Sequence, residues 1–139
     1  MFAAFPLLAL PVLFYNALVL TLPQGLKSPL AQDQMARELV RIPTASGGSW
    51  PIDTGDVLVF AALLILFIEL LKSTASRRIA IINHSLSMIM FIACLVEFLL
   101  LPAFATSTFF LITVMVLLDV LAGFIVTIAS ARRDIDIVN

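Results

Sequence analysis

Asp119 is a single carboxylate in the sequence "VLLDVLAG", and the apolar run 109–128 around it has no other charged residue. An ionised aspartate at the centre of a bilayer costs about 2.5–3.5 kcal/mol on insertion scales, so this position needs a physical explanation. The sequence leaves three open. In the first, Asp119 is neutral and bonded to Asn16, Tyr15, Ser87 or a backbone carbonyl. In the second, it faces an aqueous cavity and moves protons or cations. In the third, it pairs with a basic or polar group on another subunit.

Two neighbouring apolar segments have polar residues at helical spacing. The first series consists of Asn83, Ser87, Met90, Cys94 and Glu97. The second series consists of Thr108, Ile112, Met115, Asp119, Ala122 or Gly123, Thr127 and Ser130. Steps of three and four residues predict one shared face on each helix, and small residues there allow close approach and hydrogen bonds between helices. A short turn joins the segments, which predicts an antiparallel pair whose polar faces meet each other or the other spans.

The carboxylates on these two segments are expected at different depths. Folding the pair at residues 104 and 105 places Asp119 near the midplane of the membrane. The same fold places Glu97 about 10 Å nearer to the outer surface, at 1.5 Å per residue. The two groups are therefore not expected to share a proton.

Glu69 is a third acidic residue within an apolar segment. Folding the chain across residues 72–78 brings Glu69 to the depth of Asn83 and His84. Two expectations follow: a hydrogen bond between Glu69 and His84, or extension of the Glu69 side chain to water at the membrane surface.

The composition places these residues in a membrane. The chain has 139 residues, of which 62% are hydrophobic and 12% are charged, and its mean hydropathy is +1.14. Soluble domains are about a quarter charged, and a chain this short has too little interior to bury so much apolar surface. The net charge of −1 provides no basic surface for nucleic acid, so we expect no nucleic-acid partner.

The apolar segments predict an all-α membrane protein, a single domain over 1–139, with four transmembrane helices in an up-down bundle. The first segment lacks the basic start and the cleavage site of a signal peptide, so we expect a retained span. The expected spans are 2–22, 54–73, 79–102 and 107–131.

The basic residues predict the orientation of the spans. Lys72, Arg77 and Arg78 lie between the second and third spans, and Arg132 and Arg133 follow the fourth. Cytoplasmic loops are enriched in such residues, so both termini are expected in the cytoplasm and the loop 23–53 outside. The compact chain has no eukaryotic sorting signal, and we expect a bacterial inner membrane.

The loop 23–53 contains a helix-like pattern. Ser28 is a candidate N-cap, a proline follows it, and Pro43 is a stop signal, so the pattern predicts a helix over 29–42. Either this helix lies amphipathically in the membrane interface or it packs on the outer face of the bundle. The expected interfacial anchors are Met35, Leu39, Ile42 and Trp50.

Residues that are rare in this chain exclude several activities. The one cysteine, Cys94, cannot support dithiol chemistry, and the one histidine, His84, cannot supply both axial ligands of a haem b. The sequence has no nucleophile–base pair, phosphate loop or metal-ligand cluster. We therefore expect no enzymatic activity, no catalytic residue, no metal and no cofactor.

The sequence favours a non-enzymatic accessory or scaffold subunit that assembles with itself or with a larger membrane complex through polar helix faces. The alternative is a small homo-oligomeric channel or transporter that moves protons or cations by means of Asp119. The expected partners are the lipid bilayer and other membrane subunits. The candidate residues for either role are Asp119, Glu97, Asn83, His84, Ser87, Glu69, Gly123 and Thr127.

Overall fold

The computed structural model describes residues 5–72 and 77–136, without the side chains of 77–80, 126–127 and 129–136. The chain is mostly helical, 73% of it, as the sequence predicts. The elements in chain order are α1 (Ala9–Thr21), η2 (Gly25–Lys27), α2 (Ala31–Met35), β1 (Glu38–Pro43), β2 (Ser49–Asp53), α3 (Thr54–Lys72), α4 (Arg77–Leu100), η3 (Pro102–Phe104) and α5 (Ser107–Asp136).

Three helices among the described residues are long and apolar enough to cross a membrane: α3, α4 over Ile81–Leu100, and α5 over Ser107–Ile125. The first predicted span is only partly seen, as the 13-residue apolar helix α1. Thirteen residues extend about 20 Å, less than the roughly 30 Å of a hydrocarbon core. Three candidate spans and a shorter apolar helix are thus present, and the four-span bundle is not confirmed.

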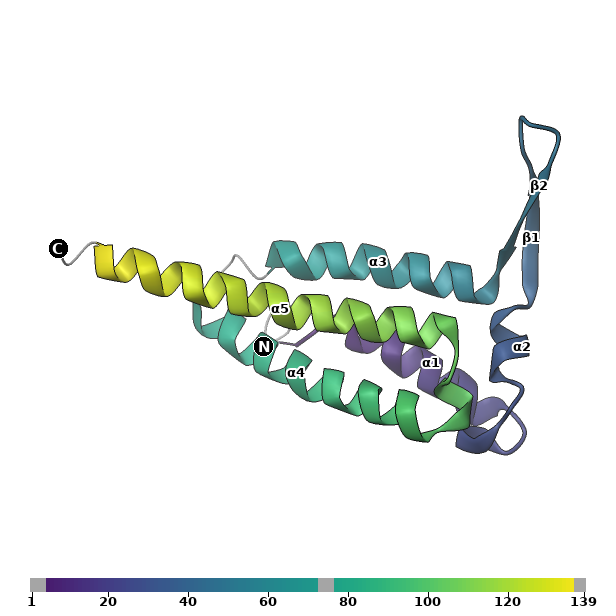
Figure 1. Ribbon diagram of the computed structural model, residues 1–139, viewed down its shortest axis with the longest axis horizontal. Coiled ribbons are helices and arrows are strands. Elements are labelled where there is room, and N and C mark those ends of the chain that lie inside the picture. Colours follow the sequence, from purple (N-terminus) through teal and green to yellow (C-terminus); the bar gives the residue numbers. More distant parts are fainter. Residues whose placement is uncertain (1–4, 73–76, 137–139) are drawn as a thin grey trace.

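The helix α5 is the centre of the bundle. Figure 1 shows α5 running between α3 and α4, with α1 packed on the same bundle. Half of the apolar window of α5 (50%) is buried, compared with 28% in α3 and 17% in α4. The outer faces of α3 and α4 are consequently covered with exposed apolar side chains, as expected of helices that contact lipid.

An aromatic cluster fixes α1 to the turn between α4 and α5. The hydroxyl of Tyr15 lies 3.0 Å from the carbonyl oxygen of Ala103, to which it donates, and 2.7 Å from Oγ1 of Thr106. The Tyr15 ring packs 5.5 Å from Phe104 and 4.8 Å from Phe109, between ring centroids. A buried tyrosine needs a partner for its hydroxyl, and the turn provides two.

The predicted interfacial helix over 29–42 is wrong beyond Met35. The helix α2 ends there, and β1 and β2 form an antiparallel hairpin. The β-branched residues Val40 and Ile42 have low helix propensity, and they alternate with other residues as a strand requires. Gly47, with a φ of +83°, permits the turn in "TASGG". Cross-strand pairing therefore prevails over the helix start signals at Ser28.

The hairpin leaves the bundle at the beginning of α3 and stands at a steep angle to that helix (Figure 1). A reciprocal capping box fixes this junction. The backbone N–H of Asp56 donates to Oδ1 of Asp53 over 2.8 Å, and the N–H of Asp53 donates to Oδ2 of Asp56 over 3.2 Å. Thr54 adds a backbone bond of 3.1 Å to the carbonyl of Arg37. The hairpin base is therefore held to the first turn of α3.

Candidate functional site

Glu69 is the centre of a buried polar network at the end of α3. Its side chain is fully buried. Oε2 accepts the backbone N–H of Leu7 over 2.7 Å, and Oε1 accepts Nδ2 of Asn83 over 2.5 Å. Nζ of Lys72 lies 2.9 Å from Oε1 and donates to the carbonyl oxygen of Phe5 over 2.6 Å. One carboxylate thus joins the segment before α1 to α3 and α4.

Both expectations for Glu69 are therefore wrong. Glu69 does not bond to His84, because the neighbouring Asn83 is the residue of α4 that faces it. It does not extend to water either, because the chain leading into α1 covers it and supplies the Leu7 N–H. The sequence could indicate an acid at this depth. It could not indicate a backbone donor located 62 positions earlier in the chain.

Asp119 bonds to Ser87, which is one of the four partners that the sequence offered. The Ser87 hydroxyl donates to Oδ2 of Asp119 over 2.6 Å, and both side chains are fully buried. Tyr15 bonds elsewhere, as described above. Asn16 donates to Oε2 of Glu97 over 3.4 Å and to the carbonyl of Val12 over 3.1 Å. The contact between Ser87 and Asp119 joins the polar faces of α4 and α5 within one chain.

Most of both polar series lies inside this chain. On α4, Asn83, Ser87 and Cys94 are buried, whereas Glu97 and Met90 are half-buried. On α5, the residues of the series from Thr108 to Asp119 and Gly123 are buried, whereas Ala122 is half-buried. Thr127 and Ser130 lie in α5, but their side chains are outside the described residues. The polar faces therefore serve first to pack α4 and α5 against each other and against α1 and α3.

Asp119 and two residues of α4 have buried polar atoms that lack a hydrogen-bond partner among the described residues. These atoms are Oδ1 of Asp119, Oδ1 of Asn83, and both ring nitrogens of His84. Buried polar atoms are normally paired, because each unpaired one costs about 1–3 kcal/mol. These unpaired atoms, one of them on the buried Asp119, make this part of the described bundle interior the candidate site for proton or cation movement.

Gly123 allows α4 and α5 to approach closely at His84. A β-carbon added to Gly123 would collide with the imidazole ring. His84 and Gly123 line a hollow of about 340 Å³, together with Ser85, Met88 and Phe124. No group of three or more His, Cys, Asp or Glu side chains within the described ranges is arranged to hold a metal ion.

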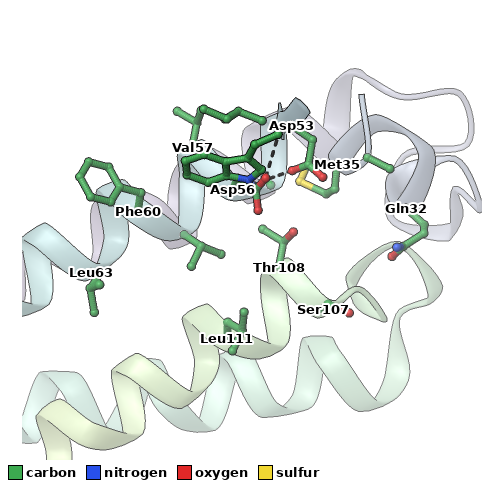
Figure 2. A pocket seen from close by; sticks show the side chains of 15 residues that line it. Gln32, Met35, Asp53, Asp56, Val57, Phe60, Leu63, Ser107, Thr108 and Leu111 are labelled. Atoms are coloured by element: carbon green, nitrogen blue, oxygen red, sulfur yellow. Dashed lines mark hydrogen bonds between the residues drawn. The ribbon is translucent and has the colours of Figure 1, made fainter. Parts of the chain in front are cut away.

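A larger hollow of about 650 Å³ lies where the hairpin meets α3 and α5; we call it the hairpin groove. Figure 2 shows Phe60 and Leu63 of α3 on one side and Thr108 and Leu111 of α5 on the other. Its polar lining residues include Gln32, Asp53, Asp56, Ser107 and Thr108. The sequence could not indicate this groove, because one of its walls is the hairpin.

The four expected interfacial anchors occupy two different environments. Met35 is buried in the hairpin groove, whereas Leu39, Ile42 and Trp50 are exposed on the hairpin; of these three, Trp50 also lines the groove. Gly55 forms part of the groove where α3 meets α5, and a β-carbon there would collide with Oγ1 of Thr108.

An ion pair lies on the surface of the hairpin. Arg41 donates from Nε to Oε1 of Glu38 over 2.8 Å and from Nη2 to Oε2 over 2.5 Å. These hydrogen bonds lower the pKa of Glu38 and raise the pKa of Arg41 from their ordinary values. Both groups are solvent-exposed, so the pair contributes little to overall stability.

No protein-family model, curated protein or solved structure matches the chain.

Proposed function

We propose that the chain is a non-enzymatic accessory or scaffold subunit of a membrane, which assembles with itself or with a larger membrane complex. The observation that carries this proposal concerns the three acids in the apolar parts of the helices whose side chains the structure describes: each accepts a hydrogen bond from the same chain. Glu69 accepts from Asn83, Glu97 from Asn16, and Asp119 from Ser87. Acids used in this way hold helices together and specify their register.

The outer surface of the bundle supports the same proposal. Because the polar side chains are mostly directed inward, partner helices would meet an apolar surface. The helix α4 offers the least covered one, with Ile89, Leu99 and Leu100 each more than 60% exposed. In a membrane, such a face packs equally well against lipid or another helix, so a partner would be selected by shape rather than by burial of apolar area.

The proposal includes a location. The basic residues that end α3, begin α4 and follow the apolar part of α5 favour cytoplasmic termini. With that orientation the hairpin lies on the outer side of a bacterial inner membrane. Three apolar helices are compatible with an integral membrane protein of this kind.

Asp119→Asn tests the scaffold proposal. Asparagine keeps the shape of the side chain and can still accept the Ser87 hydroxyl, but it cannot ionise. We expect the variant to retain the partners that co-purify with the wild-type protein in mild detergent, and we expect neither protein to pass protons in liposomes. Asp119→Leu, which removes the acceptor, should instead weaken the bundle and its complex.

A second candidate function is a small homo-oligomeric channel or transporter that moves protons or cations. It is favoured by Oδ1 of Asp119 and the ring nitrogens of His84, which have no hydrogen-bond partner among the residues that the structure describes. A buried acid near an imidazole is a common arrangement in proton pathways. Proton flux by the wild-type protein in liposomes, lost in Asp119→Asn while assembly is unchanged, would establish this function and overturn the scaffold proposal.

A further inference from the structure

The hairpin is amphipathic. Its register pairs Val40 with Ile52 and Ile42 with Trp50, while Arg41 lies opposite Pro51. Side chains alternate between the two faces of a strand, so the first two pairs share one face and Arg41 lies on the other. The first face, which we call the apolar hairpin face, consists of Val40, Ile42, Trp50 and Ile52.

This face is largely uncovered within the chain. Val40, Ile42 and Trp50 are 50%, 42% and 57% exposed. A two-stranded sheet is only marginally stable in water and needs its apolar side packed against something. The capping box fixes the base of the hairpin, but it covers none of these side chains. No described part of the chain covers the apolar hairpin face, which leaves it available to an external apolar phase.

The apolar hairpin face is continuous with the membrane-facing side of α3. Trp50 and Ile52 line the hairpin groove together with Phe60 and Leu63. Phe60 and Leu63 are exposed on a helix that is long and apolar enough to span the bilayer. Apolar side chains therefore connect the outer side of α3 with the groove and with the apolar hairpin face, and an acyl chain could follow this path.

The charged residues of the groove lie where the hairpin meets α3, beside the apolar side chains of Met35, Trp50 and Ile52, and the lining further along α3 is apolar. Asp53 and Asp56 lie at the beginning of α3, and Ser107 lies at the beginning of α5. Leu63 is seven residues beyond Asp56, which corresponds to about 10 Å along the helix. Figure 2 shows Leu63 at one end of the hollow and the acidic residues nearer its middle, beside Met35. The same change, from charged to apolar within about 10 Å, occurs between the headgroups and the acyl chains of a membrane leaflet.

We propose that the hairpin groove holds an acyl chain of a membrane phospholipid and that the apolar hairpin face lies on the same leaflet. The steep angle between the hairpin and α3 places the hairpin along the membrane surface when α3 crosses the bilayer (Figure 1). Trp50 then lies at the interface, the depth that tryptophan prefers. Glu38 and Arg41 point to water on the opposite side. This inference is independent of the scaffold proposal, since it concerns lipid rather than a protein partner.

Trp50 is the only tryptophan, so its fluorescence reports on the hairpin alone. The full chain is reconstituted in phosphatidylcholine nanodiscs in which the acyl chains are brominated near the headgroup or near the methyl end. We expect strong quenching by the first lipid, weak quenching by the second, and little quenching by aqueous acrylamide. Quenching by acrylamide without quenching by bromine would place the hairpin in water. Protection from both quenchers would show a protein occupant, such as a second copy. Either result overturns the proposal.

Matched variants test the face assignment. Ile42→Asp adds a charge to the apolar hairpin face, and Ser49→Asp adds the same charge to the opposite face, one pair further along. We expect the first variant to lose most of the quenching by brominated lipid and the second to keep it. Equal loss or equal retention in the two variants contradicts the assignment.

Native mass spectrometry tests occupancy of the groove. Leu63→Phe narrows the groove, whereas Leu64→Phe enlarges the next residue of α3, which is exposed outside it. We expect the wild-type protein and Leu64→Phe to retain a phospholipid adduct after transfer from detergent and Leu63→Phe to lose it. A wild-type spectrum without an adduct, or an adduct that persists in Leu63→Phe, overturns the groove assignment.

Discussion

The hydroxyl of Ser87 donates a 2.6 Å hydrogen bond to the carboxylate of Asp119, and this contact joins α4 to α5 where both side chains are fully buried. The partner of the most conspicuous acid in the sequence therefore belongs to the same chain. The other carboxylate oxygen of Asp119 has no partner among the described residues, so the site is half satisfied. This asymmetry allows both a structural and a proton-moving role to be tested at one residue.

Ser87→Ala removes the hydroxyl that satisfies Asp119. Leaving a buried acceptor unpaired costs about 1–3 kcal/mol, so we expect the free energy of unfolding to fall by about that amount. Unfolding in mixed micelles titrated with sodium dodecyl sulfate, followed by circular dichroism, measures the change. Ser85→Ala is the control, because Ser85 is exposed and donates only to the carbonyl of Ile81 in its own helix. An equal effect of both substitutions would contradict the assigned role of Ser87.

Glu69→Leu should destabilise the bundle more than Ser87→Ala does. It leaves the Asn83 amide, the Leu7 N–H and the Lys72 ammonium without their common acceptor. Removing one member of a buried charged pair costs about 3–5 kcal/mol. The same detergent titration measures it, and Glu69→Gln, which keeps one acceptor oxygen, should have a smaller effect. A loss below that of Ser87→Ala would show that the network contributes little.

Gly123→Ala should separate α4 from α5, because the added methyl group meets the ring of His84. Overpacking of this kind costs about 1–3 kcal/mol. His84→Ala should remove the clash, so the double variant should recover much of the stability lost in Gly123→Ala. A double-mutant cycle in the free energy of unfolding measures the coupling. Purely additive effects would mean that His84 and Gly123 do not touch.

The pair of Glu38 and Arg41 should give the hairpin a pH dependence. The pKa of Glu38 is lowered in the folded chain, mainly by the hydrogen bonds from Arg41. A lowered folded pKa means that the pair stabilises the hairpin above the ordinary glutamate pKa and that this contribution is lost as the pH falls through the folded value. Carbon-13 NMR of the Glu38 carboxyl group should show the low titration, and Arg41→Gln should return it to the ordinary range. An unshifted titration in the wild-type protein would exclude the ion pair in solution.

The proposed orientation predicts which introduced cysteines react from outside the cell. A membrane-impermeant thiol reagent should label a cysteine at Ser46, in the turn of the hairpin, but not one at Ser76, between the second and third predicted spans. The wild-type protein is the control, since its one cysteine, Cys94, is buried. Labelling at position 76 alone would invert the topology.

Long apolar segments could be predicted from the sequence because lipid imposes a minimum length and forbids unpaired charge. The structure has helices α3, α4 and α5 close to three of the expected spans, and each is long and apolar enough to cross a membrane. The segment 29–42 has both a helix start signal and a strand-like alternation at Val40 and Ile42. Only the pairing partner, the strand from Ser49 to Asp53, decides between them.

The candidate site could be predicted less completely. Ser87 was one of the expected partners of Asp119 because helical spacing placed both residues on facing stripes. The network of Glu69 could not be predicted because two of its contacts use backbone groups. The Leu7 N–H donates to Glu69, and the Phe5 carbonyl accepts from Lys72. Backbone groups are the same at every position, so no sequence pattern distinguishes the ones that a buried acid will use.

The strand β2 ends at Asp53 and α3 begins at Thr54, so no linker residue separates them. The capping box between Asp53 and Asp56 joins the two elements, so the hairpin and the first turn of α3 are expected to move together. Any change in the tilt of the hairpin must tilt the first turn of α3 as well. That turn contains Gly55, which has no room to move toward Thr108 of α5. The close contact between Gly55 and Thr108 therefore couples the base of the hairpin to the central helix of the bundle.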